Sequence, residues 1–195
     1  MTDADVNMLD RDFSRLVDMR WLLSLIDTAR GEDMAERGDV TTDACIAAGR
    51  IGTAGVRSRA AGRLAGAKLI GLIAKRYDPA IDVTLHRRDG EALAPGDAVA
   101  RLVGPLRSIL AAERVVLNFL THLSGIATLT DRHVQAVAGT RAGIYDTRKT
   151  LPGYRGLAKY AVRCGGGHSH RMGLHDAVLI KDNHIAGAAD LAAAV

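Results

Sequence analysis

Apolar side chains in the first 35 residues recur at the spacing of an amphipathic helix. Between residues 13 and 35 they occur in adjacent pairs, with three or four positions from one pair to the next: Leu16 and Val17, Trp21 and Leu22, Leu25 and Ile26. This period predicts one or two helices, with a break at Gly31. Trp21 is expected to anchor the core. The next stretch, residues 40–42, is expected to be a short extended segment.

Residues 44–104 have the pattern of a small α+β unit. Residues 65–76 are helical in period, and Asp78-Pro79 should end that helix. Apolar and polar side chains then alternate over residues 81–85, which predicts a strand. Turn residues at 89–90 and 95–97 separate this strand from a further apolar run at residues 98–103.

A long helix is predicted from about residue 108 onwards. Its apolar face comprises Ile109, Leu110, Val116, Leu117, Leu120, Leu123 and Leu129. Ser108 is suited to cap its start, and Gly125 is expected to bend or divide it. Arg114, Asn118 and Thr121 share the opposite side at four- and three-residue spacing.

Two apolar runs near the C-terminus each end on charged residues. Residues 142–146 lead into Thr147, Arg148 and Lys149, and residues 177–180 lead into Lys181. A helical period covers about residues 154–163, between the two runs. Strands that alternate with a helix in this way predict parallel α/β units, whose functional sites gather at the carboxyl ends of the strands.

Positive charge is concentrated in this last third. The whole chain has a formal charge of +4, but residues 131–181 carry nine Lys and Arg against three Asp and Glu. Clustered cations repel one another unless an anion joins them, so a small polyanionic ligand would fit here. Isolated solvated surface cations remain the alternative. Aromatic content of 4% argues against a nucleic-acid surface, which would interleave aromatic and basic side chains.

The remaining chemistry in the sequence is sparse. Cys45 and Cys164 lie far apart without metal-binding spacing, so a reducing compartment and a cytoplasmic location are expected. No uninterrupted apolar run approaches membrane-spanning length, so no membrane partner is expected. The glycines at 49, 52 and 55 are expected to be turn glycines, because Gly-x-Gly-x-x-Gly order, a Gly-Lys-Ser/Thr and a clear preceding strand are all lacking. No metal site is predicted, because four of the histidines lack zinc-site spacing: His168, His170, His175 and His184.

Several separate motifs occur in one order along the chain. They occupy residues 38–42, 113–118, 123–128, 146–150, 159–167, 170–171 and 178–184. In this combination they resemble the quinolinate phosphoribosyltransferases, the carboxylating nicotinate-nucleotide pyrophosphorylases of NAD synthesis. The resemblance covers nearly the whole chain. The other phosphoribosyltransferase class, with paired acids before a Thr-Gly-rich loop, has no counterpart here.

The resemblance implies a two-domain fold. Residues 1–115 would form an α+β, sandwich-like N-terminal domain. Residues 116–195 would form the first part of an α/β open-barrel (TIM-like) phosphoribosyltransferase domain, incomplete in this chain.

The resemblance also implies a reaction and a set of site residues. Quinolinate and phosphoribosyl pyrophosphate would give nicotinate mononucleotide, pyrophosphate and CO2. Lys149 is the expected catalytic residue, and the expected substrate-binding residues are Arg114, Thr147, Arg148, Lys149, His170, Arg171 and Lys181. Mg²⁺ would accompany phosphoribosyl pyrophosphate, with its ligands outside this chain. A homodimer is expected, in which Arg114 reaches the partner's site.

Two departures from the family pattern leave alternatives open. His168-Ser169 stands where the family usually has an apolar residue and Asn, beside the expected acceptor site. A pyrophosphorylase-like paralogue associated with molybdate transport, acting on another acid, therefore remains possible. The chain also stops at Val195, before the units expected to carry an acidic pair and Gly-rich phosphate loops. We accordingly expect a fragment, which could be a non-catalytic anion-binding piece.

Overall fold

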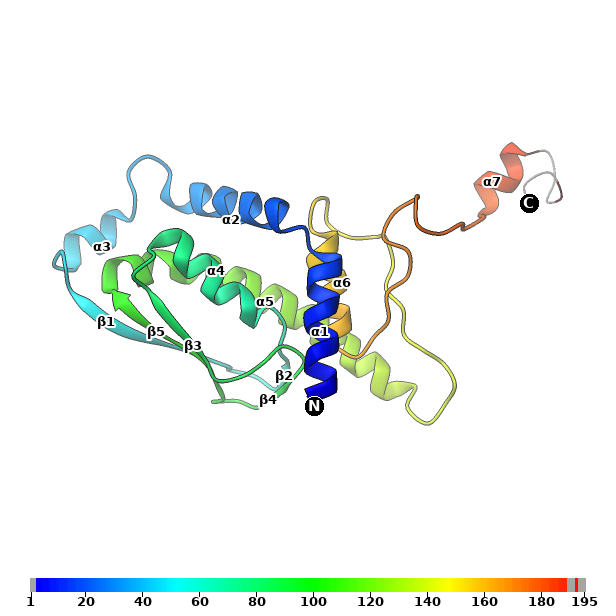
Figure 1. Ribbon diagram of the computed structural model, residues 1–195, viewed down its shortest axis with the longest axis horizontal. Coiled ribbons are helices and arrows are strands. Elements are labelled where there is room, and N and C mark those ends of the chain that lie inside the picture. The colour runs from blue at the N-terminus through cyan, green and yellow to red at the C-terminus, as the bar shows by residue number, and fades with distance from the viewer. Residues whose placement is uncertain (1–2, 189–191, 193–195) are drawn as a thin grey trace.

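The computed structural model describes residues 3–188 and 192, which form an elongated body with α7 at one end (Figure 1). The helices are α1 (Asp3–Leu16), α2 (Met19–Met34), α3 (Val40–Cys45), α4 (Ala67–Tyr77), α5 (Leu106–Ala136), α6 (Arg155–Cys164) and α7 (Asp182–Gly187). The strands are β1 (Ile51–Arg57), β2 (Gly62–Arg63), β3 (Asp82–Leu85), β4 (Ala92–Leu93) and β5 (Ala98–Pro105).

The N-terminal part is built on a small antiparallel sheet. Its strand order is β1-β5-β3, and β2 and β4 form a separate two-stranded ladder. Helices α4 and α5 pack against each other beside this sheet. The buried face of α4 comprises Ala67, Leu69, Ile70, Ile73 and Ala74. The predicted α+β unit, including its helix and both turns, is confirmed.

Two helices occupy the first 35 residues, as the apolar period allowed. Asp18 separates them and caps α2, because its Oδ1 accepts hydrogen bonds from Arg20 N–H at 2.8 Å and Trp21 N–H at 3.2 Å. The expected break at Gly31 is wrong, since α2 continues to Met34. One glycine in a helix costs about 1 kcal/mol, which is less than burial of Leu22 and Ile26 contributes.

Residues 40–42 are helical, which corrects the expected extended segment. Asp39 caps α3 by accepting a 2.9 Å hydrogen bond from Thr42 N–H, and the Thr42 hydroxyl also donates to this carboxylate. These two bonds hold the pKa of Asp39 below its usual value. The β-branched residues at positions 40–42 favour an extended backbone. The Asp39 cap outweighs this preference, because it satisfies free N–H groups at the start of the helix.

Helix α5 is continuous, so the expected division at Gly125 is wrong. Ser108 does not cap it either, since the helix begins at Leu106 and the Ser108 hydroxyl donates to Asp78 at 2.8 Å.

By length and composition α5 is the one helix in the described ranges that could cross a membrane, a criterion that buried core helices also meet. Its apolar face packs on α4 and α6. The predicted domain boundary at 115/116 lies inside α5 and stays a prediction.

Two strands and a helix were predicted in the last third of the chain, and the described residues contain the helix in full. Helix α6 matches the helical period, but neither apolar run is a regular strand in the described part of the chain. Residues 142–146 contribute a single parallel bridge, Tyr145 with His168, and residues 177–180 have no assigned secondary structure. Strand geometry is stabilised only when a neighbouring strand pairs with the backbone, and apolar composition alone does not supply that neighbour.

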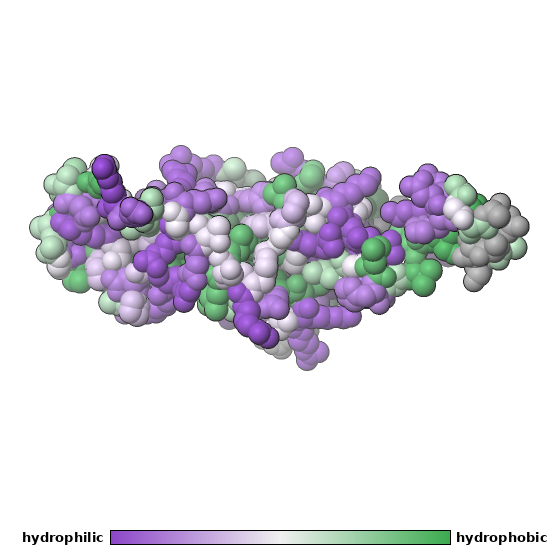
Figure 2. Space-filling model, turned by 90° about the horizontal axis from the view of Figure 1, so that it is seen from above, coloured by the Kyte–Doolittle hydropathy of each residue, from purple (hydrophilic) through white to green (hydrophobic). Residues whose placement is uncertain are grey.

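Helix α6 is fastened to the N-terminal part through buried side chains. Phe13 of α1 meets the ring of Tyr160 edge-on, with 4.9 Å between the ring centroids. Tyr160 is fully buried, and its hydroxyl donates a 2.8 Å hydrogen bond to Asp89. Asp89 also accepts from Ala67 N–H at the start of α4. The segment that leads to α7 is different, because Leu174 and Val178 are exposed, and apolar atoms show near that end in Figure 2.

Candidate anion-binding site

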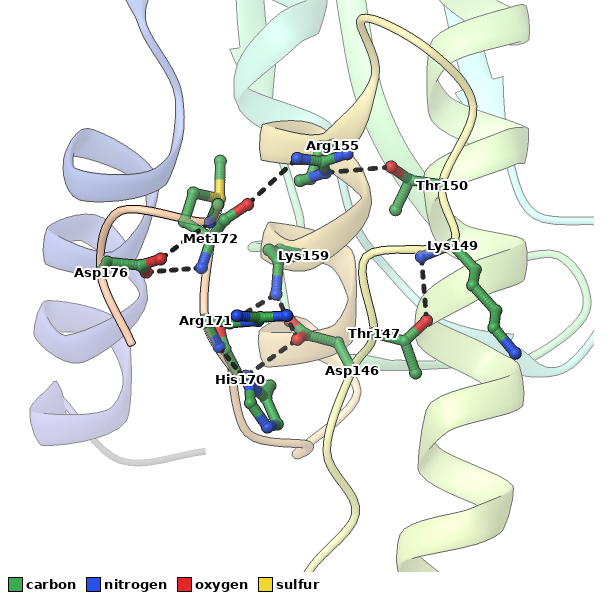
Figure 3. A network of polar contacts seen from close by, with 11 residues as sticks. Asp146, Thr147, Lys149, Thr150, Arg155, Lys159, His170, Arg171, Met172 and Asp176 are labelled. Carbon is green, nitrogen blue, oxygen red and sulfur yellow. Dashed lines mark hydrogen bonds and ion pairs between the residues drawn. The ribbon is translucent and has the colours of Figure 1, made fainter. Parts of the chain in front are cut away.

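Three cations of α6 organise the loops that surround this helix. Arg155, Lys159 and Arg163 lie four residues apart and therefore share one side of α6. Arg155 donates from Nη1 to the Met172 carbonyl at 3.1 Å and from Nε to the Thr150 hydroxyl at 3.4 Å. Arg155 thus joins the loop after residue 146 to the loop after residue 170 (Figure 3).

Lys159 is the middle cation and lies at the centre of this network. Its side chain is 1% exposed and forms an ion pair with Asp146, whose side chain is 4% exposed. Lys159 Nζ also donates to the His170 carbonyl at 3.1 Å, while Asp146 Oδ1 accepts from His170 N–H at 2.9 Å. The buried pair therefore bonds to both the N–H and the C=O of His170.

His170 and Arg171 present their side chains from this fixed backbone. His170 Nδ1 accepts a 2.6 Å hydrogen bond from Arg171 N–H, which leaves the proton of a neutral imidazole on the exposed Nε2. Arg171 is half-buried, and its Nη1 donates to the Ala177 carbonyl at 3.0 Å. The remaining N–H groups of this guanidinium are of the kind that bind a carboxylate in pairs.

The turn after Arg171 is closed by Asp176. Its carboxylate accepts hydrogen bonds from the N–H groups of Met172 and Gly173, the second at 2.9 Å. These two bonds hold the pKa of Asp176 below its usual value. Asp176 is therefore a loop anchor rather than a proton donor at neutral pH.

The loop at residues 147–149 carries three of the predicted residues. Thr147 Oγ1 accepts a 3.1 Å hydrogen bond from Lys149 N–H, which forms a local turn. Arg148 is half-buried, and its Nε is a buried donor that has no hydrogen-bond partner within the described ranges. Such a donor suits a carboxylate ligand. The Lys149 side chain is exposed and extends away from Asp146 and His170 (Figure 3).

Two other predicted residues lie apart from this cluster. Arg114 is exposed on the side of α5 that it shares with Asn118 and Thr121, as the helical spacing predicted. Lys181 precedes α7, which Figure 1 shows well away from α6, and its N–H donates to His184 Nδ1 at 2.9 Å. The structure thus brings His170 and Arg171 to Asp146 and Lys159, and Thr147 and Arg148 directly follow Asp146 in the same loop. It does not bring Arg114 or Lys181 to them.

His168 lies between Tyr145 and Arg163 of α6. Its ring packs on Tyr145 with 5.1 Å between the centroids, and its Nδ1 lies 3.4 Å from Arg163 Nη1. Arg163 in turn pairs with Asp12 of α1 at 2.7 Å. The contacts of His168 are therefore to α6 and to Tyr145 at the parallel bridge, and its effect on acid specificity stays a prediction.

The described residues offer no group of three His, Cys, Asp or Glu side chains that could hold a metal ion. Mg²⁺ prefers carboxylate oxygens. The carboxylate of Asp146, which lies in this cluster, is already paired with Lys159. These residues do not fit a Mg²⁺ site. Cys164 is no candidate nucleophile, because burial raises the pKa of its thiol.

Sequence reasoning assigned no role to Lys159, Asp146 or Arg155. A signal was present in the four-residue spacing of the α6 cations. Lys159 also lies among Leu157, Tyr160 and Ala161, all of them buried. A lysine at such a position needs a buried partner, and Asp146 was the acid within an already recognised motif.

Fold and site together define a protein with an α+β N-terminal part, followed by a part of helices and loops that carries a cationic cluster suited to a small acidic ligand. The model of the quinolinate phosphoribosyl transferase N-terminal domain matches residues 39–124, and that of the C-terminal domain matches residues 126–195. The chain belongs to the quinolinate phosphoribosyltransferase family.

Curated relatives agree with this assignment. The chain is 45% identical over 166 residues to nicotinate-nucleotide pyrophosphorylase [carboxylating] of Mycobacterium leprae, which covers 83% of this chain and 57% of that protein. It is 42% identical over 174 residues to the chloroplastic protein of the same name from Arabidopsis thaliana, covering 89% of this chain and 49% of that protein. The chain thus spans about half the length of the curated relatives it matches.

Solved structures show the same two-domain fold. NadC from Streptococcus pyogenes superposes with a TM-score of 0.86 at 37% identity, over 91% of this chain and 63% of that chain. The nicotinate-nucleotide pyrophosphorylase from Francisella tularensis gives a TM-score of 0.86 at 39% identity, over 91% and 62%. The predicted fold class is confirmed.

Proposed function

We propose that this chain binds quinolinate as part of a phosphoribosyl transfer from phosphoribosyl pyrophosphate. The reaction would yield nicotinate mononucleotide, pyrophosphate and CO2, a step of NAD synthesis. The observation that supports this most directly is the buried Asp146–Lys159 pair. It holds together two loops that match the family motifs and carry Arg148, His170 and Arg171.

The proposed roles follow from the chemistry of each side chain. Planar guanidinium groups bind carboxylates through two parallel hydrogen bonds, so Arg148 and Arg171 would each hold one carboxylate of the acid. His170 would donate from Nε2, and Thr147 would line the same site. Lys149 would supply charge near the pyrophosphate leaving group and act as the catalytic residue, with positioning and electrostatics dominating the rate. Lys181 would complete the acid site once its segment lies against the cluster.

The finer parts of the proposal concern groups beyond this cluster. Mg²⁺ would bind together with phosphoribosyl pyrophosphate, through ligands other than the described residues, which do not fit a Mg²⁺ site. A homodimer would bring Arg114 of one protomer to the site of its partner, which suits the exposed position of Arg114 on α5. A cytoplasmic location suits two free cysteines.

Calorimetric titration of quinolinate into the folded chain tests the acid site, with nicotinate as the control ligand. We expect quinolinate to bind at least about tenfold more tightly, because nicotinate lacks one carboxylate and so one charge-assisted contact. Arg148→Ala should abolish binding, while Arg101→Ala, an exposed arginine on β5, should leave it unchanged. Equal affinity for both acids, or undiminished binding by Arg148→Ala, contradicts the proposal.

A second candidate function is anion binding without turnover, which needs only the cationic side chains around Asp146 and Lys159. An assay of pyrophosphate release in a mixture of quinolinate and phosphoribosyl pyrophosphate distinguishes the two candidate functions. Binding without release supports the non-catalytic alternative. Release with another aromatic acid but not with quinolinate supports the paralogue associated with molybdate transport.

A further inference from the structure

We propose that Lys159 and Asp146 form a positioning pair that fixes the His170 backbone and keeps the neighbouring cations available for the acid. This role rests on the proposed function, since it assumes that His170 and Arg171 contact the substrate. Neither member of the pair would touch the substrate itself. Both side chains are almost fully buried.

The pair fixes the position of His170 through two bonds from opposite directions. Asp146 accepts from His170 N–H at 2.9 Å, and Lys159 donates to the His170 carbonyl at 3.1 Å. Rotation of this part of the backbone would break at least one of the two bonds. Because His170 Nδ1 bonds to Arg171 N–H, the imidazole orientation follows from the same anchoring. The direction of the Nε2 proton is thereby set before any ligand arrives.

The pair also links the two proposed ligand-binding loops, one that follows Asp146 and one that follows His170. Asp146 immediately precedes Thr147 and Arg148, and His170 immediately precedes Arg171. Lys159 is supplied by α6, which lies between the two loops in sequence and contacts both (Figure 3). A shift of either loop would therefore alter the distance between the Arg148 and Arg171 guanidinium groups.

The charge arrangement supports a positioning role over a purely stabilising one. A buried ion pair rarely adds net stability over well-packed apolar side chains, because both charges lose their hydration. This one serves another purpose, because Lys159 holds the carboxylate of Asp146. The other acid of the network, Asp176, is bonded to the backbone N–H groups of its own turn. Asp146 is then kept from pairing with Arg148 or Arg171. Those guanidinium groups remain available for a dicarboxylate.

Three variants of the full chain separate positioning from stability. Lys159→Met and Asp146→Asn each leave one buried charge unpaired, so both should unfold at lower temperature. The double variant Lys159→Met/Asp146→Asn has no buried charge and should recover most of the stability. The His170 carbonyl has then lost its donor, and His170 N–H has a neutral amide oxygen in place of a carboxylate as its acceptor, which is a weaker bond.

The matched control is Arg63→Met, which breaks the Arg63–Asp131 pair and the bond to the Gly90 carbonyl. It should lower the unfolding temperature without changing the dissociation constant for quinolinate. The double variant should show the opposite behaviour, with nearly normal stability and a dissociation constant raised at least about tenfold. A double variant that is stable and binds quinolinate as tightly as the unmodified chain overturns the positioning role.

Backbone amide hydrogen exchange in the unliganded chain provides a readout that does not depend on quinolinate. His170 N–H should be protected in the unmodified chain and in Arg63→Met, and should exchange at least about tenfold faster in the double variant. If the unmodified chain binds no quinolinate, the proposed function fails. The positioning role is then judged by exchange alone, and unchanged His170 protection in the double variant overturns it.

Discussion

Asp89 is a buried carboxyl group whose ionisation depends on its surroundings. The carboxylate is 4% exposed, and loss of hydration raises its pKa above the usual value for aspartate. Hydrogen bonds from Ala67 N–H and the Tyr160 hydroxyl act in the opposite direction and stabilise the charged form. The net effect is a carboxyl group that keeps its proton to a higher pH in the folded chain than in the unfolded one.

Tyr160→Phe is predicted to destabilise the protein more at neutral pH than at acid pH. A raised folded pKa means that the contribution of Asp89 is fully present below its unfolded pKa of about 3.9 and is lost as the pH rises through the folded pKa. Loss of the Tyr160 hydroxyl raises the Asp89 pKa further, because the charged form has one donor fewer. The penalty at pH 7 should be about 1–3 kcal/mol and should shrink towards pH 4, as measured by urea unfolding.

Asp89→Asn provides the control for this pH dependence. An amide does not ionise in this range, so Tyr160→Phe in that background should cost the same free energy of unfolding at pH 4 and pH 7. A penalty that still grows with pH would mean that another group is responsible.

At the scale of elements, the position of α6 depends on glycines that permit close contact. A Cβ at Gly156 would lie 2.4 Å from the Leu16 carbonyl oxygen, and one at Gly165 would lie 2.4 Å from the Ala127 carbonyl oxygen. Both obstructing atoms belong to the backbone and cannot rotate away. Helix α6 can therefore approach both the end of α1 and helix α5 only because these positions lack side chains.

Gly156→Ala is predicted to destabilise the fold by about 1–3 kcal/mol, since the added methyl must push α6 away from α1. Gly31 in α2 is the matched control, because a Cβ there meets no atom within 4 Å. Gly31→Ala should stabilise the protein by about 0.5–1 kcal/mol through its better helix propensity. Thermal and chemical unfolding of the two variants should thus shift in opposite directions. A shift in the same direction would contradict the close contact at Gly156.

At the scale of the whole molecule, the proposed homodimer would divide each site between two protomers. Arg114 lies on an exposed side of α5, whereas Arg148 belongs to the loop that follows Asp146. If each site takes Arg114 from the partner, two inactive variants can complement each other in a mixed dimer.

An equimolar mixture of Arg114→Ala and Arg148→Ala, unfolded and refolded together, is predicted to regain quinolinate binding. Half of the dimers would be mixed, and each would hold one intact site, so about a quarter of the normal number of sites should return. Calorimetry gives the stoichiometry, and analytical ultracentrifugation confirms the dimer. The two variants refolded separately and then combined provide the baseline. No recovery in a demonstrated mixed dimer would mean that Arg114 serves its own protomer or no site at all.

Much of the architecture was predictable because it depends on local chemistry. The periods of α4 and α6, and the turns at residues 89–90 and 95–97, were recognised correctly, since helix amphipathicity and turn residues act over a few positions. The cationic motifs around Arg148 and Arg171 were recognised for a similar reason, as contiguous residue types in a fixed order. Residues 40–42 were not, because the Asp39 cap outweighed the extended preference of Val and Thr.

The amino-acid sequence alone was sufficient for the family and for the order of most elements. Only the tertiary structure determined that Lys159 is buried and pairs with Asp146, and that His168 turns towards Tyr145. The same is true of the absence of regular strands at residues 142–146 and 177–180 in the described part of the chain. The physical reason is range: caps, periods and motifs involve neighbours in sequence, whereas burial, ion pairing and strand pairing require partners that only folding brings close.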